Sequence, residues 1–320
     1  MKRVLVVTLS NIGDVILTTP VMSNLAQIYP DAKLTVVVGP KAENLLKGSR
    51  LIDRIVVYDK HASLAAKFEM IRELRKHIYE TVVDLRNTAI PFLVSTKKRS
   101  PLKRHYKETL RRARHLELLK MMGFHIDENL RFDFFREEEQ VRMKKLFQEK
   151  NILLEKGYVI VAPAAQSELK SWKIEGFRYV LEKLLRETSY SILLLGDQRE
   201  REIAQPLVSL DPVRIHNLCA ETSLKEAAAL VSQSKLVLAN DSALMHLGFE
   251  LNRPVVAIFG PTNDEKYGRK GESFRIVREK MDCAPCESAQ CWFSRQACFE
   301  DLNPEKVLNA CQELLHVYSH

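Results

Sequence analysis

The chain has 320 residues, about twice the size of an average domain, so its length predicts two domains that can each bury a core. Hydrophobic residues make up 46% of the chain and charged residues 28%, a balance that excludes a disordered or collagen-like protein. The net charge of +8 is concentrated in one segment, because residues 97–114 contain nine lysines and arginines against one glutamate.

The apolar runs of the chain are too short to cross a membrane. Runs such as Val4–Thr8 and Pro254–Gly260 fall far below the roughly 18 residues that a membrane span requires. Near the N-terminus, Asn11, Gly13 and Asp14 interrupt the hydrophobic stretch too early for a signal peptide. We therefore expect a cytoplasmic protein.

Short β-branched runs alternate with longer helical patterns in the first half. Buried strands are predicted at Arg3–Thr8, Lys33–Gly39, Arg54–Asp59 and Thr81–Leu85. Helices are predicted at Pro20–Ile28, Leu64–His77, Glu108–Met122 and Arg136–Glu149. The last of these helices is strongly charged, which is typical of an exposed helix before a domain junction.

The same alternation starts again after residue 153. Strands are predicted at Tyr158–Ala162, Ser191–Leu195, Lys235–Ala239 and Val255–Phe259. Helices are predicted at Ile174–Glu187, Arg199–Leu207, Leu224–Ser232 and Ala243–Leu251. Alternating strands and helices favour parallel sheets with helices on both faces. The sequence thus predicts an α/β protein with two doubly wound domains, residues 1–153 and 154–320.

Ligands of such sheets bind at the carboxyl ends of the strands, so the loops that follow strands are the candidate sites. After the first strand, Gly13 permits a tight turn and Asp14 falls where a helix begins, a place where the helix dipole favours a carboxylate. The alternative is that Asp14 only caps that helix. This loop lacks the glycine spacing of a dinucleotide-binding fingerprint.

Two loops of the second half are candidates for binding an anion. In the loop 163–172, small residues let the backbone approach a ligand and Lys170 offers a positive charge, although a lysine in a polar loop is often only solvated. Later, Asp241 and Ser242 precede a helix whose free N–H groups either bind an anion or are merely capped. His246 lies one turn into that helix and faces either the core or a ligand.

The order and spacing of these loops resemble glycosyltransferase family 9, the ADP-heptose:lipopolysaccharide heptosyltransferases. The segments IGDVILTTP, PAAQSELKSW, NDSALMHLGFELNRPVVAIFGPT and CAPCESAQCWFSRQACFEDLNPEKV carry the resemblance, which extends from Val4 to Val307. It implies the GT-B architecture, in which two Rossmann-like domains face a cleft. The first domain would bind the acceptor and the second the donor nucleotide, and the last helix, residues 304–317, would cross back to the first domain.

The resemblance also implies an activity, the inverting transfer of a heptose or related sugar from an ADP-sugar to the lipopolysaccharide inner core. Asp14 would be the general base, and Lys170 would neutralise the leaving diphosphate. The implied donor-binding residues are Ala165, Gln166, Ser167, Lys170, Glu200, Thr222, Asp241, Ser242, Ala243 and His246. We expect no catalytic metal or other cofactor, because the chain contains no Asp-x-Asp motif.

Four cysteines near the C-terminal end have a spacing that is compatible with a metal site. Cys283, Cys286, Cys291 and Cys298 form the pattern C-x2-C-x4-C-x6-C, which predicts a structural zinc ion or a cluster. The alternative is a set of reduced thiols that pack a loop, since a cytoplasm disfavours disulfides.

The basic segment, residues 97–114, has one aromatic residue and no nucleic-acid-binding motif, so no nucleic-acid partner is expected. We interpret its residues Lys103, Arg104, Arg111 and Arg112 as contacts for an anionic, lipid-linked oligosaccharide acceptor. They would also support peripheral contact with the inner face of the membrane. A solvated helix face is the alternative interpretation. The alternative function is a non-catalytic protein that binds a nucleotide sugar or an anionic lipid on the same scaffold.

Overall fold

The computed structural model describes residues 1–154 and 156–317 and divides into two units, Met1–Phe134 and Phe135–His320. Each unit has its own parallel sheet, which confirms the predicted fold class of two parallel-sheet α/β domains. Residues 155 and 318–320 of the predicted second domain lie outside the described residues. Among the helices that the structure describes, none combines the length and apolarity needed to cross a membrane.

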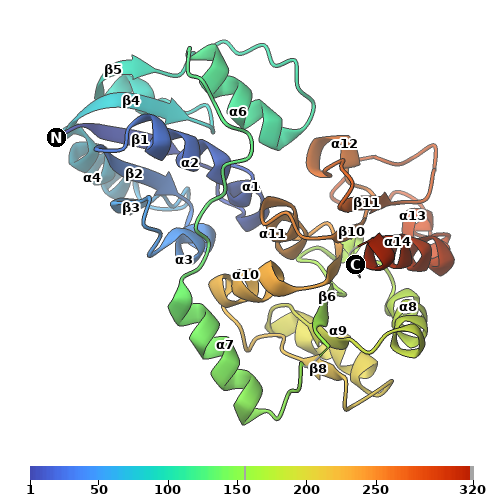
Figure 1. Ribbon diagram of the computed structural model, residues 1–320. Coiled ribbons are helices and arrows are strands. Elements are labelled where there is room, and N and C mark those ends of the chain that lie inside the picture. Colours follow the sequence, from blue (N-terminus) through green and yellow to red (C-terminus); the bar gives the residue numbers. More distant parts are fainter. Residues whose placement is uncertain (155, 318–320) are drawn as a thin grey trace. The chain divides into compact units, whose positions relative to one another are not determined.

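The first unit contains a five-stranded sheet in the order β3-β2-β1-β4-β5, with every strand pair parallel (Figure 1). Its strands are β1 (Arg3–Val7), β2 (Lys33–Val38), β3 (Arg54–Val57), β4 (Ile78–Asp84) and β5 (Ser95–Arg99). Its helices are α1 (Ile12–Ile16), α2 (Thr19–Ile28), α3 (Glu43–Leu46), α4 (Leu64–Arg75), α5 (Ile90–Leu93) and α6 (Arg111–Met121), with the 3-10 turn η1 (Pro40–Ala42).

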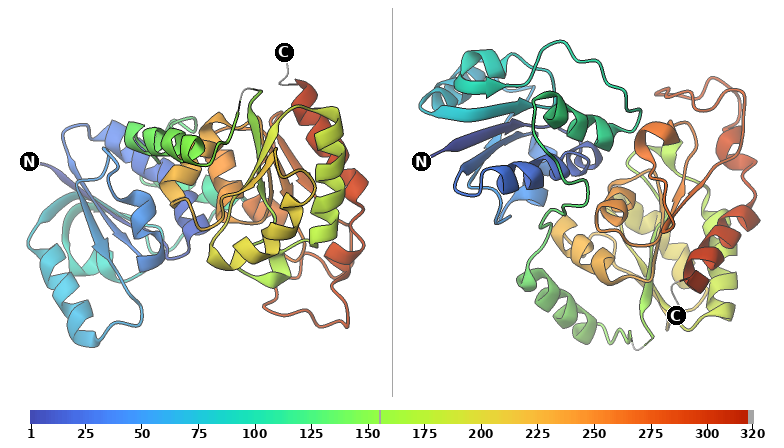
Figure 2. Two further views of the ribbon diagram at one scale, coloured as in Figure 1. Left: turned by 90° about the horizontal axis from the view of Figure 1, so that it is seen from below. Right: turned by 45° about the horizontal axis from the view of Figure 1, so that its top comes forward.

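The second unit contains a six-stranded parallel sheet in the order β11-β10-β9-β6-β7-β8. Figure 2 shows its ribbon, green to red, from two further sides. Its strands are β6 (Tyr158–Ala162), β7 (Ser191–Leu194), β8 (Ile215–Asn217), β9 (Leu236–Asn240), β10 (Val255–Ile258) and β11 (Phe274–Val277). Its helices are α7 (Glu137–Glu149), α8 (Ile174–Glu187), α9 (Gln198–Val208), α10 (Leu224–Gln233), α11 (Ala243–Glu250), α12 (Asp264–Tyr267), α13 (Ala297–Glu300) and α14 (Pro304–Val317), with the 3-10 turn η2 (Glu168–Lys170).

Each predicted strand is present, and the additional strands β5, β8 and β11 lie at sheet edges. An edge strand pairs on one side only and needs no buried face. The sequence of β5, Ser95–Arg99, is accordingly polar and carries no apolar run. Strand β8 has three residues, too few to show a period.

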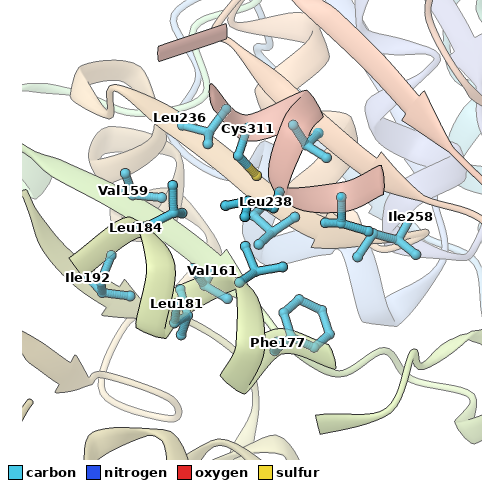
Figure 3. Packing of buried hydrophobic residues seen from close by; sticks show 14 of the residues in the cluster. Val159, Val161, Phe177, Leu181, Leu184, Ile192, Leu236, Leu238, Ile258 and Cys311 are labelled. Atoms are coloured by element: carbon cyan, nitrogen blue, oxygen red, sulfur yellow. The ribbon is translucent and has the colours of Figure 1, made fainter. Parts of the chain in front are cut away.

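One hydrophobic cluster of the second unit lies between its sheet and helices that include α8 and α14. Side chains of β6, β7, β9 and β10 meet those of α8 and α14, as Figure 3 shows with Val161, Leu238, Ile258, Phe177 and Cys311. Helix α14 contacts α8 and strands β9 to β11. The family resemblance implies that this last helix crosses back to the first domain, which stays a prediction. Within the second unit, the apolar face of α14 is buried in the core.

The division between the units falls near residue 134, about 20 residues before the predicted boundary at 153. Helix α7 belongs to the second unit because it packs on α10. Two ion pairs join these helices: Lys225 Nζ lies 2.7 Å from Glu139 Oε1, and Arg142 Nε lies 2.8 Å from Glu226 Oε1. Burial raises the pKa of Glu139, but the hydrogen bonds from Lys225 and from the backbone of Arg136 outweigh it, so the net shift is downward.

The loop that precedes α8 depends on close packing of Trp172 against Gly176. The Trp172 side chain is 2% exposed, and a Cβ added at Gly176 would overlap its indole ring. We therefore expect Gly176→Ala to lower the free energy of unfolding by about 1–3 kcal/mol, the usual cost of overpacking. Urea denaturation measures this change, and exposed Glu175→Ala in the same helical turn is the matched control. Equal stability of the two variants would contradict the packing.

Candidate functional site

Both sheets reverse their strand order at one point, and such a switch point is where open α/β sheets bind ligands. In the second unit the reversal lies between β6 and β9, which pair with Ala162 opposite Ala239. In the first unit it lies between β1 and β4, which pair with Val7 opposite Asp84. The loops after these four strands therefore contain the candidate site residues.

At the second unit's switch point, Lys170 from the loop after β6 meets Asp241 from the loop after β9. The Nζ atom of Lys170 donates to Oδ2 of Asp241 at 2.6 Å. The Asp241 side chain is 6% exposed and that of Lys170 is 40% exposed, so a buried carboxylate holds a cation whose outer side is in solvent. His246 Nε2 lies 3.8 Å from the other oxygen of Asp241.

Hydrogen bonds from the Asn240 side chain to the backbone also connect the two loops at this switch point. The buried Asn240 side chain accepts a hydrogen bond from the backbone N–H of Trp172 at 3.0 Å, and its Nδ2 donates to the carbonyl of Ala162 at 3.5 Å. Within the loop after β6, the N–H of Ala165 donates to Ser171 Oγ at 2.9 Å. Asn240 is not among the site residues predicted from the sequence. The feature that could have identified it is its place as a polar residue at the end of an apolar strand.

Helix α11 begins at this switch point without a side-chain cap. Ser242 occupies the N-cap position, but its Oγ is buried and accepts no hydrogen bond from the first turn. The first backbone N–H groups, beginning at Ala243, are therefore left uncapped by that side chain, which is the arrangement that binds anions at helix N-termini. Gln166 and Ser167 are exposed in the neighbouring loop, whereas His246 is 4% exposed.

Glu200 and Thr222 lie away from the Lys170–Asp241 pair, after β7 and β8. Glu200 forms a capping box at the start of α9, where its carboxylate accepts the backbone N–H of Asp197 at 2.6 Å. Burial raises the pKa of Glu200. Thr222 precedes Ser223, the N-cap of α10. Both residues follow the carboxyl ends of β7 and β8, which lie next to β6 in the sheet. They therefore lie at the same edge of the sheet as the switch point.

In the first unit, Asp14 lies in the first turn of α1, directly after β1. The N-cap position is taken by Asn11, so the alternative in which Asp14 caps the helix is wrong. Asn11 Nδ2 donates to Asp14 Oδ2 at 3.1 Å, and the Asp14 side chain is partly exposed. Among the described residues the carboxylate has Asn11 as its side-chain partner, and its partial exposure makes it accessible to solvent.

Across the same switch point, the loop after β4 presents Arg86, which the sequence analysis does not single out. Its guanidinium donates through one terminal nitrogen to Ser10 Oγ at 3.0 Å. It also lies 5.2 Å above the ring centre of Tyr58. The feature of the sequence that could have identified Arg86 is its position two residues after an apolar strand that ends in Asp84.

The basic segment is divided among strand β5, a loop and helix α6. Lys103 is exposed in the loop, and Arg104 donates through Nε to the carbonyl of Pro101 at 2.8 Å. Arg112 is 8% exposed and its guanidinium donates to the carbonyl of Glu128 at 2.8 Å. That Arg112 contacts an acceptor stays a prediction; in the structure this residue is buried and holds the chain at residue 128.

Helix α6 also carries a histidine that stays neutral near pH 7. Burial, followed by the charges of Arg111, Arg104 and Arg114, lowers the pKa of His115 to about 4. His115, directly after the basic segment, therefore adds no positive charge to it near neutral pH.

The four C-terminal cysteines line one cavity of about 410 Å³, together with Trp292 and Phe293. Their thiols are free; Cys286 and Cys291 are exposed, and Cys298 is buried. Burial raises the pKa of Cys298, and the neighbouring Cys283, Cys286 and Cys291 raise it further. Across residues 1–154 and 156–317, no three His, Cys, Asp or Glu side chains are placed to hold a metal ion, so the predicted zinc ion or cluster is unsupported.

Comparison with known proteins gives a family and a fold. Residues 86–296 match the model of "Glycosyltransferase family 9 (heptosyltransferase)". Lipooligosaccharide heptosyltransferase 2 of Campylobacter jejuni is 25% identical over 95% of both chains. A family 9 glycosyltransferase from Veillonella parvula has a similar structure, with a TM-score of 0.79 at 22% identity over 99% of this chain and 98% of that one. The ADP-heptose lipopolysaccharide heptosyltransferase II of Escherichia coli has a TM-score of 0.76 at 21% identity over the whole of both chains.

The Lys170–Asp241 pair gives a stability prediction. Lys170→Met leaves the Asp241 carboxylate buried without its cation, so we expect the free energy of unfolding to fall by about 1–3 kcal/mol. Adding Asp241→Asn should restore part of that loss, because the uncompensated charge is removed. Lys144→Met, an exposed substitution on α7, is the control, and denaturant unfolding is the measurement. If the double variant is no more stable than Lys170→Met, the two side chains are not coupled as described.

Proposed function

The chain belongs to glycosyltransferase family 9, and from that premise we propose that it transfers a heptosyl group from ADP-heptose to the inner core of lipopolysaccharide. The membership confirms the family resemblance and the glycosyltransferase class drawn from the sequence. The proposed donor and acceptor are supported by the relatives, since the C. jejuni protein is named a lipooligosaccharide heptosyltransferase and the E. coli protein an ADP-heptose lipopolysaccharide heptosyltransferase.

The observation that carries the proposal is the cation at the second unit's switch point. The ammonium group of Lys170 has three N–H donors, and the contact with Asp241 uses one of them. The others are available to the oxygens of a diphosphate. The uncapped N-terminus of α11, with the Ser242 hydroxyl beside it, adds backbone donors for the same group.

In the proposed reaction, an acceptor hydroxyl attacks the anomeric carbon while the bond to the diphosphate oxygen breaks. Asp14 takes the proton of the hydroxyl as general base. Lys170 and the N–H groups of α11 stabilise the negative charge that develops on the leaving ADP. Attack opposite to the leaving group inverts the anomeric centre. The scheme requires no catalytic metal, because protein groups supply the positive charge.

Donor recognition is proposed for the loops of the second unit and acceptor recognition for those of the first. Ala165, Gln166 and Ser167 lie in the loop that carries Lys170. Glu200 and Thr222 would contact the nucleoside at the same sheet edge. Lys103, exposed in the basic segment, and its neighbours Arg104 and Arg111 are proposed to attract the anionic acceptor and the inner face of the membrane that holds it.

The proposal makes a sharp prediction for Asp14. Asn at this position keeps the size of the side chain and an oxygen that can accept from Asn11, but it is not a base near neutral pH. We expect Asp14→Asn to bind ADP as the wild type does and to lose about 10²–10⁴-fold in kcat, the usual range for loss of a general base. The assay measures transfer at saturating donor and acceptor.

Exposed Asp31→Asn is the matched control, since it makes the same change in charge outside the candidate site. A rate for Asp14→Asn close to that of the control would remove Asp14 from the mechanism. It would favour the alternative, a non-catalytic protein that binds a nucleotide sugar or an anionic lipid.

A further inference from the structure

Arg86 follows β4 at the switch point of the first unit. Among the described residues, its guanidinium contacts two neutral groups, the hydroxyl of Ser10 and the ring of Tyr58. The loop that carries it follows β4 and is fixed by a buried carboxylate. Asp84 is fully buried, and its oxygens accept the backbone N–H of Arg86 at 2.8 Å and the hydroxyl of Thr88 at 2.9 Å. The backbone of this turn passes through Asn87 with φ at 62°, a left-handed conformation that asparagine tolerates.

The guanidinium itself is fixed by two neighbouring loops. Ser10, from the loop after β1, accepts its hydrogen bond at 3.0 Å, and the ring of Tyr58, directly after β3, lies beneath it at 5.2 Å. The position of Ser10 depends in turn on Gly39 after β2, because an added Cβ there would lie 2.7 Å from Ser10 Cα. Loops after four neighbouring strands thus converge on one cation.

Arg86 has no salt-bridge partner within the part of the chain that the structure describes. No carboxylate of those residues lies within ion-pair distance of its guanidinium, whereas Lys170 at the other switch point is paired with Asp241. A guanidinium has five N–H donors in a flat fork, and the Ser10 contact uses one. The side chain is partly buried, so an anion that bound there would be less screened than at an open surface.

We propose that Arg86 is an oxyanion-binding residue of the acceptor site, holding a carboxylate or phosphate group of the acceptor in its guanidinium fork. The fork geometry matches both groups, and a fixed cation lacking a carboxylate partner favours an anionic ligand. Arg86 and Asp14 follow the two strands that flank the same switch point, so an anion on Arg86 would position the acceptor at the edge where the base stands. This inference rests on the proposed function for the identity of the acceptor.

The alternative is that Arg86 only stabilises the loop through Ser10 and Tyr58. Arg86→Gln keeps a donor for Ser10 and removes the charge, and Arg86→Lys keeps the charge and loses the fork. Arg75→Gln, on the exposed surface of α4, makes the same change of charge elsewhere and serves as the matched control. Each variant is tested with a lipopolysaccharide-core acceptor in three forms: intact, dephosphorylated, and with its carboxyl groups esterified.

The experiment measures acceptor KM and kcat by transfer, and the Kd of acceptor and of ADP by calorimetry. We expect Arg86→Gln to raise the KM and Kd of the intact acceptor by about 10- to 100-fold, with Arg86→Lys between it and the wild type. The Kd of ADP should not change. The acceptor form that lacks the contacted group should bind the wild type as weakly as the variant, and it identifies whether the group is a carboxylate or a phosphate.

Two results would overturn the inference: an effect of Arg86→Gln no larger than that of Arg75→Gln, or the same loss with all three acceptor forms. If the proposed function is wrong, the experiment gives a result that differs from these two. In that case the wild type transfers no heptose, while acceptor Kd values still report whether Arg86 binds the anion. A wild type that neither binds nor transfers to any acceptor form would contradict both proposals.

Discussion

The candidate chemistry of both units depends on where a parallel sheet reverses its strand order. Neighbouring parallel strands send their following loops in opposite directions at this point, which opens a space between the loops that side chains and ligands can fill. The reversal lies between β1 and β4 in one sheet and between β6 and β9 in the other. Asp14, Arg86, Lys170 and Asp241 all come from loops after these strands, although they are far apart in the sequence.

The two switch points hold their cations in different electrostatic environments. Lys170 is paired with a carboxylate that is almost fully buried, so the pair has little net charge and the lysine is held in one place. Arg86 has a hydroxyl and an aromatic ring as its partners, so its charge is retained. In the proposed reaction the diphosphate carries several negative charges and would also meet the N-terminus of α11, whereas the acceptor would meet Arg86 with a single anionic group.

The sequence was sufficient to predict the sheets, because buried parallel strands are continuous apolar runs and the runs alternate with amphipathic helices. It was not sufficient for β5, whose residues are polar, or for β8, which has three residues. Asp14 and Lys170 stand out by their position after strands. Arg86, Asn240 and the pairing of Lys170 with Asp241 do not, because they depend on contacts between loops that are distant in sequence. The cysteine spacing predicted a metal, but no three of the described ligand side chains are placed to hold one, although the four cysteines line one cavity.

Transfer of heptose is the activity on which the proposed roles of Asp14, Lys170 and Arg86 all depend. Purified protein should be incubated with ADP-heptose and a lipopolysaccharide acceptor that lacks heptose, and the acceptor and nucleotide should be analysed by mass spectrometry. The account predicts that the acceptor gains a heptosyl residue and that one ADP is released for each residue gained, while UDP- and GDP-sugars give no product. An unchanged acceptor mass with ADP-heptose, under conditions where the protein is folded and binds ADP, would contradict it.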